Sequence, residues 1–254
     1  PITPNIIALI SIPLYTEDLS VAEYGVLGTV EITIQVLIAA FSFSLQQALS
    51  RWNWDNEYKH KQKTIFFTTL LATLCGVFLM FLVLSPFSRS LSISLLDSQD
   101  YTYLFQLMLI SAGVHIFSKV ILLAMRLQRK ALQFSLSNIF KLVITLGLTI
   151  YFIVDLDRGL EGIIEAQIIG FIALILLNLP FIIRNATPVF ESSILKEMLL
   201  FSYPLAISAV GSVLLTVTDK YAVRYIGGMD DMGLYNLGFR IANVLKVFII
   251  NSVF

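Results

Sequence analysis

The chain has 254 residues, of which 57% are hydrophobic and only 13% are charged, and its mean hydropathy is +0.84. A typical soluble domain carries about 25% charged residues, so this composition excludes an ordinary soluble domain. The 17 basic and 17 acidic residues balance, which excludes a global electrostatic field that would recruit nucleic acid.

Apolar stretches long enough to cross a bilayer recur along the whole chain. A membrane-spanning helix needs about 20 mostly apolar residues, and we predict an all-α bundle of eight such spans. In chain order they cover residues 1–14, 24–50, 64–86, 101–125, 134–154, 162–183, 199–218 and 234–254. The first span is too short for a full crossing and the last has no closing loop, so we expect a fragment of a longer transporter.

Basic residues favour every second loop. If the amino end is cytoplasmic, the cytoplasmic loops carry nine of them: Arg51, Lys59, Lys61, Lys63, Arg126, Arg129, Lys130, Arg184 and Lys196. The opposite loops carry four: Arg89, Arg158, Lys220 and Arg224. The positive-inside bias therefore predicts a cytoplasmic amino end.

A weak internal repeat relates the second and eighth spans. Residues 23–28 read EYGVLG and residues 231–238 read DMGLYNLG, and aligning Gly25 with Gly233 gives an offset of 208 residues. Six spans separate the two units, and an even number preserves their direction across the membrane. We therefore predict parallel repeats in a six-plus-six transporter. Residues 1–190 would form the first lobe, and residues 191–254 the seventh and eighth helices, which begin the second.

Five short segments carry a family resemblance. They read LSVAEYG at 19–25, QALSRW at 47–52, LKEMLLFSYPL at 195–205, DKY at 219–221 and GLYN at 233–236. Their order and spacing resemble the bacterial polysaccharide biosynthesis proteins, the O-antigen type flippases of lipid-linked oligosaccharides, which are related to multidrug and toxin extrusion (MATE) transporters.

The resemblance implies a multi-pass protein of the bacterial cytoplasmic (inner) membrane that is not an enzyme. Such a protein moves undecaprenyl-pyrophosphate-linked oligosaccharide from the inner to the outer leaflet by alternating access, for lipopolysaccharide or other surface polysaccharide. The implied partners are this lipid-linked oligosaccharide, membrane lipids and a polysaccharide polymerase machinery, with no nucleic acid. No cofactor is expected, and coupling to H⁺ or Na⁺ is left open.

Charged residues inside spans are expensive and usually face the bundle interior or a watery cavity. Here they are Glu31, Lys119, Lys141, Glu165, Arg240 and Lys246. His115 and Lys119 share one face of the fourth span, and Lys141 lies on the fifth at a similar predicted depth. Two cations there suit a pyrophosphate. The alternative for each lysine is snorkelling, in which the stem stays in lipid and the amine reaches the interface.

The eighth span supplies three further substrate candidates, Asn236, Arg240 and Asn243, which recur at helical spacing. Arg240 carries a permanent charge about two turns inside the span, and we expect it to contact substrate or a carboxylate partner. Glu31 and Asp219 are the candidates for ion coupling. Glu165 lies close to a loop, and we expect it to be exposed.

Two other functions stay open. A MATE-type drug or cation antiporter is the main alternative, but basic Lys119, Lys141 and Arg240 argue against a cationic substrate. A membrane enzyme such as a polysaccharide polymerase or ligase would need catalytic groups gathered at a wet site. The short outer loops contain no His, and the sequence shows no metal-ligand spacing.

Overall fold

A computed structural model of the chain describes the backbone of residues 20–253 and the side chains of residues 20–243. The predicted first span and the side chain of Lys246 lie outside these residues. The described chain is helical, with the following helices: α2 Val21–Phe41, α3 Leu45–Trp54, α4 Gln62–Leu84, α5 Ser88–Leu96, α6 Thr102–Leu127, α7 Ala131–Ile150, α8 Gly159–Leu177, α9 Leu179–Asn185 and α10 Ser192–Val253. A 3₁₀ turn, Ser85–Phe87, joins α4 to α5, and a π-helical turn, Tyr151–Asp155, extends α7.

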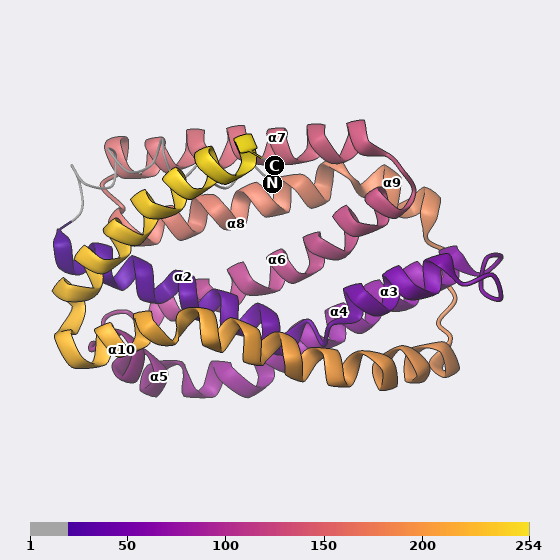
Figure 1. The fold of residues 1–254 in the computed structure, drawn as a ribbon, viewed down its shortest axis with the longest axis horizontal. Coiled ribbons are helices and arrows are strands. Elements are labelled where there is room, and N and C mark those ends of the chain that lie inside the picture. The colour runs from indigo at the N-terminus through magenta and orange to yellow at the C-terminus, as the bar shows by residue number, and fades with distance from the viewer. Residues whose placement is uncertain (1–19, 254) are drawn as a thin grey trace.

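The helices form an elongated bundle (Figure 1). The α3–α4 connection, α9 and the start of α10 lie at one end, and the start of α2, α5 and the bend of α10 lie at the other. Within the described residues, six helical segments are long and apolar enough to cross a membrane. Many large apolar side chains remain exposed on the bundle, including Phe78, Leu132 and Ile183. Such a surface fits contact with lipid.

Helix α10 contains both the predicted seventh and eighth spans. Its backbone leaves the helical region at Gly228, where φ is 88° and ψ is −169°, and the chain turns back on itself there (Figure 1). A φ in this range favours glycine, which has no Cβ. The loop predicted between the two spans is therefore wrong, because helix continues to the bend and includes Lys220 and Arg224.

The predicted second span is two helices. Helix α2 ends at Phe41, Phe43 and Ser44 adopt left-handed φ values of 47° and 50°, and α3 follows from Leu45. Neither residue is Gly or Pro, so the sequence carries no signal for this break. The start of α2 is better marked, since Ser20 and Glu23 form a capping box in which each side chain accepts from the other residue's backbone N–H.

Three apolar clusters hold the described bundle together. One joins α2, α6 and α8 through residues such as Leu27, Met108 and Ile164. Another joins α3, α4, α6 and the first half of α10 through residues such as Trp52 and Met198. The third is small and joins α2 to both halves of α10 through Ile32, Val217 and Met232. The first half of α10 is thus packed against the preceding helices at the α3 end of the bundle, where the Trp52 and Phe201 rings lie 5.6 Å apart.

Candidate functional site

Two of the predicted substrate residues lie against one aromatic ring, and a third lies beside one of them. His115 of α6 stacks on Phe171 of α8, with ring centroids 4.5 Å apart. The Nζ atom of Lys141, on α7, lies 4.3 Å from the centroid of the same ring. Lys119, one turn beyond His115, is near enough to interact electrostatically with it, as is Lys141. The structure therefore brings His115, Lys119 and Lys141 together, as their spacing predicts, and we call them with Phe171 the basic cluster.

No carboxylate of the described residues pairs with the lysines of the basic cluster. Among residues 20–243, ion pairs join Lys61 to Glu191, Arg158 to Glu165, Arg224 to Asp97 and Arg240 to Glu31. None of them includes Lys119 or Lys141, and both lysines are half-buried. Two half-buried cations within apolar helices are costly where no described carboxylate pairs with them, and an anionic ligand would offset that cost.

Three other predicted residues, Glu31, Asn236 and Arg240, lie apart from the basic cluster, between α2 and the second half of α10. Arg240 and Glu31 form an ion pair of 2.5 Å, in which the arginine side chain is 11% exposed and the glutamate 32%. The Arg240 guanidinium also lies 5.3 Å from the centroid of the Tyr24 ring. The expectation of a substrate or carboxylate partner for Arg240 is met by Glu31, and we call this region the α2–α10 junction.

The α2–α10 junction contains buried hydrogen-bond donors that have few acceptors nearby. The amide Nδ2 of Asn236 and the hydroxyl of Tyr24 have no hydrogen-bond partner in the described part of the chain, although their side chains are 1% and 4% exposed. Lys220 is 8% exposed, and its Nζ lies 3.5 Å from Asn236 Oδ1 and 4.0 Å from the centre of the Phe239 ring. Unmet buried donors cost free energy, which favours a ligand or water with acceptor oxygens.

Two predicted residues are peripheral. Asp219 is exposed; it accepts a hydrogen bond from the Tyr235 hydroxyl, and its Oδ1 accepts the backbone N–H of Lys220. Asn243 is partly exposed and has no hydrogen-bond partner among the described residues. The expectation that Glu165 is exposed is wrong, because its side chain is 13% exposed, pairs with Arg158 and accepts from the Tyr103 hydroxyl.

The two glycines aligned by the internal repeat meet in space. A Cβ atom on Gly25 would collide with the backbone carbonyl of Met229, and one on Gly233 with that of Val21. Further along the same helices, Gly28 faces Asn236 and Glu31 pairs with Arg240. The offset between facing residues stays at 208 or 209, so α2 and the second half of α10 run side by side in the same direction.

A family model described as "Polysaccharide biosynthesis protein" matches residues 2–254. The chain belongs to this family. No protein with curated annotation matches its sequence.

Solved transporter structures share the fold. An inward-facing "multidrug resistance MATE family transporter of the MOP superfamily" has a TM-score of 0.63 and 17% identity, covering 96% of this chain and 62% of its own. An outward-facing transporter of the same description has a TM-score of 0.69 and 18% identity, covering 96% of this chain and 59% of its own. The chain thus spans about 60% of these structures. The chain therefore has the fold of these structures, and its long apolar helices support a multi-pass membrane protein.

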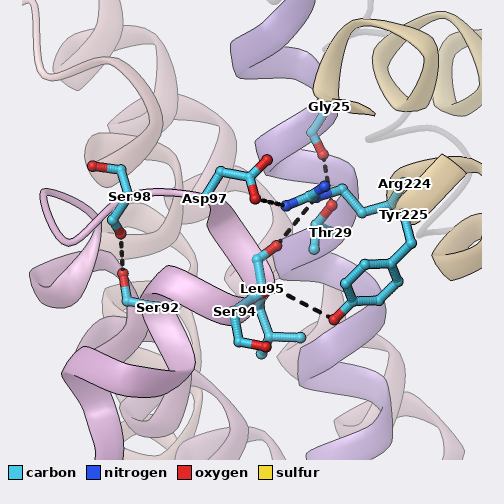
Figure 2. A network of polar contacts seen from close by, with 9 residues as sticks. All are labelled: Gly25, Thr29, Ser92, Ser94, Leu95, Asp97, Ser98, Arg224 and Tyr225. Atoms are coloured by element: carbon cyan, nitrogen blue, oxygen red, sulfur yellow. Dashed lines mark hydrogen bonds and ion pairs between the residues drawn. The ribbon is translucent and has the colours of Figure 1, made fainter. Parts of the chain in front are cut away.

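In this member of the polysaccharide biosynthesis family, a second polar contact ties α10 to the end of α5 (Figure 2). Arg224, 4% exposed, pairs with Asp97 at 2.6 Å and donates from Nε to the Leu95 carbonyl at 3.3 Å. The neighbouring Tyr225 hydroxyl donates to the Ser94 carbonyl. These carbonyls belong to the last turn of α5, whose acceptors have no partner within the helix, so α10 caps α5.

Sequence reasoning misses Arg224 and Tyr24 as parts of these sites. It counts both Lys220 and Arg224 among the loop residues because polar and charged residues follow the apolar stretch that ends near Thr218. One signal is present: the two cations are four residues apart and therefore share a helix face. No comparable signal marks Tyr24, whose aromatic ring fits any span end.

Proposed function

We propose that the full-length protein flips a lipid-linked oligosaccharide between membrane leaflets by alternating access, binding the pyrophosphate that joins lipid to glycan. The observation that carries this proposal is the basic cluster, in which half-buried Lys119 and Lys141 both lie near His115, with Lys141 over Phe171, and neither pairs with a carboxylate of the described chain. A pyrophosphate supplies the missing negative charge and several acceptor oxygens.

The positive charge of the basic cluster also favours a flippase over a drug antiporter. A lipophilic cation entering beside Lys119 and Lys141 would meet like charges in a medium where repulsion is poorly screened. A carboxylate-lined site would suit that cargo, and the carboxylate of the α2–α10 junction, Glu31, is already engaged by Arg240. The anionic head of a lipid-linked sugar has the complementary charge.

The α2–α10 junction is the proposed second contact for the same head group. Lys220, Asn236 and Tyr24 offer donors whose requirements are incompletely met. In a six-plus-six transporter, α2 belongs to the first lobe and α10 begins the second, so a ligand held there would sense their relative movement. The undecaprenyl carrier, the bacterial inner membrane and the cytoplasmic amino end are further parts of this proposal.

For coupling, Glu31 is the preferred site. It lies in a span, is half-buried and faces Arg240, so a change in its charge changes an interaction between two helices. Asp219 is exposed and held by Tyr235, which suits it less for that role. Transport under separately imposed H⁺ and Na⁺ gradients identifies the coupled ion.

Complementation tests the proposal. The full-length gene is placed in a strain lacking its own glycan flippase, and surface polysaccharide is measured for wild type, Lys141→Ala and Arg240→Ala at matched expression. Lys63→Ala, a change of an exposed lysine at the α3–α4 end, is the control. We expect rescue by wild type and the control and its loss in the other two. Drug resistance without polysaccharide would instead favour the MATE-type antiporter.

A further inference from the structure

A separate pocket of about 370 Å³ lies at the α3–α4 end of the bundle. It is formed where the end of α3 and the loop after it meet the end of α6, and Trp54, Asn56 and Gln128 are among its lining residues. These residues belong neither to the basic cluster nor to the α2–α10 junction. The pocket has the size of a small-molecule site and lies on the face to which the charge bias assigns the cytoplasm.

The pocket walls are rich in amides that have hydrogen-bonding capacity to spare. The side-chain amides of Asn53, Asn56 and Gln128 make no hydrogen bond within the described chain, while Gln62 donates to the backbone carbonyl of Asn53. Each amide offers two donors and an acceptor on one planar group. This pattern matches vicinal hydroxyls, each of which is both donor and acceptor.

An exposed aromatic ring in the same pocket also suits a sugar. Trp54 is 63% exposed, in contrast to Trp52, which is 7% exposed and packed in the core. A pyranose ring has polar edges and an apolar face of C–H groups, and an exposed indole provides a flat apolar surface for that face. Amides beside an open indole therefore fit a sugar better than a purely charged head group.

The charged residues that line the pocket restrict which class of sugar it can bind. The pocket is lined by two cations, Lys59 and Arg129, and one carboxylate, Asp55. Asp55 already accepts the backbone N–H of Glu57. The net positive lining accepts neutral or acidic sugars and disfavours amino sugars that carry a free ammonium group.

We propose that this pocket binds a neutral or acidic sugar unit of the glycan, and so contributes to glycan selection before translocation. This inference rests on the proposed flippase function. The α3 end of the bundle also contacts α10 and the residue before it, with the Tyr58 hydroxyl donating to Glu197 and Lys61 paired with Glu191. The pocket thus lies at the end of the bundle where α10 begins, near the proposed cytoplasmic mouth.

The test uses the full-length protein in lipid nanodiscs and soluble sugars without a lipid. Saturation-transfer NMR is recorded with galactose, N-acetylglucosamine, glucuronic acid and the oligosaccharide released by mild acid from the host's lipid-linked precursors. The fluorescence difference between wild type and Trp54→Phe isolates the Trp54 signal. We expect saturable binding of at least one of these sugars and its protection of Trp54 from acrylamide quenching.

Four variants distinguish binding in this pocket from unspecific binding elsewhere on the protein. Trp54→Ala and the double change Asn56→Ala, Gln128→Ala should weaken binding at least tenfold, whereas Trp54→Phe keeps a ring and should retain it. Gln47→Ala alters an exposed amide on the same helix outside the pocket and should have no effect.

Failure of this inference and failure of the flippase proposal give different results. Lys141→Ala should abolish lipid transport and leave soluble sugar binding intact. If the protein transports lipid-linked glycan but none of the four probes binds or protects Trp54, the sugar site is overturned. Protection of Trp54 by anionic lipid alone would overturn it as well, in favour of a membrane anchor.

Discussion

Gly25 of α2 and Gly233 of α10 lie against each other, and each approaches the partner helix too closely to carry a side chain. The contact is reciprocal, because Gly25 faces the carbonyl of Met229 and Gly233 that of Val21. Each of these carbonyls belongs to the residue four positions before the glycine of its own helix. Such symmetry is expected where two related helices cross at an axis between them.

The first prediction follows from this crossing. Gly25→Ala or Gly233→Ala should push the helices apart and destabilise the protein by about 1–3 kcal/mol, because the colliding atoms are backbone and cannot move aside easily. Gly238→Ala is the matched control, since a Cβ there meets nothing within 4 Å. Thermal unfolding in detergent should show lower midpoints for the first two variants only. Equal midpoints for all three would contradict the close crossing.

The second prediction concerns the cap on α5. Asp97→Asn should destabilise the protein by about 1–3 kcal/mol, because the buried guanidinium of Arg224 then keeps the Leu95 carbonyl but loses its counter-charge. Unfolding midpoints in detergent measure the change. Adding Arg224→Met should recover part of this loss by removing the uncompensated charge. A double variant less stable than Asp97→Asn alone would show that the ion pair is not what Arg224 mainly contributes.

The third prediction concerns coupling at Glu31. In proteoliposomes with an imposed H⁺ or Na⁺ gradient, Glu31→Gln should make the rate of lipid transport insensitive to the gradient that drives the wild type. The reason is that the variant keeps the shape of the side chain but loses the charge facing Arg240. Asp219→Asn should keep the wild-type response. The opposite pattern would move the coupling role to Asp219.

The fourth prediction separates charge from shape in the basic cluster. Lys141→Arg keeps the positive charge over Phe171 and should bind a pyrophosphate-bearing lipid within a few-fold of the wild type. Lys141→Met removes the charge and should weaken binding at least tenfold. Binding is measured by scintillation proximity with radiolabelled lipid. If both variants bind equally, the cluster does not recognise the pyrophosphate by charge.

Hydropathy alone predicts the helices in outline, because span length and apolar composition are local properties of the sequence. The sequence also predicts the grouping of His115, Lys119 and Lys141. The first two lie one turn apart on one helix, and Lys141 lies at a similar predicted depth on the next. The repeat that aligns Gly25 with Gly233 indicates which helices are related, although their direct contact is visible only in the structure.

Other features depend on partners far away in the sequence. Glu31 and Arg240 are 209 residues apart, and Arg224 is 129 residues from Leu95. A single sequence does not specify such pairs, so it predicts a loop position for Arg224 and no particular partner for Glu31. The break between α2 and α3 escapes prediction for a different reason, because Phe43 and Ser44 adopt left-handed φ values that side chains of their type disfavour.

The most direct test of the proposed transport is reconstituted lipid flipping. Full-length protein is placed in proteoliposomes with a fluorescent lipid-pyrophosphate oligosaccharide, and the fraction reached by an external glycosidase is followed over time. We predict rapid transfer by the wild type, at least a tenfold slower rate for the double change Lys119→Ala, Lys141→Ala, and a normal rate for Lys63→Ala. Wild-type protein that leaves this lipid in place yet transports a lipophilic cation would contradict the flippase proposal.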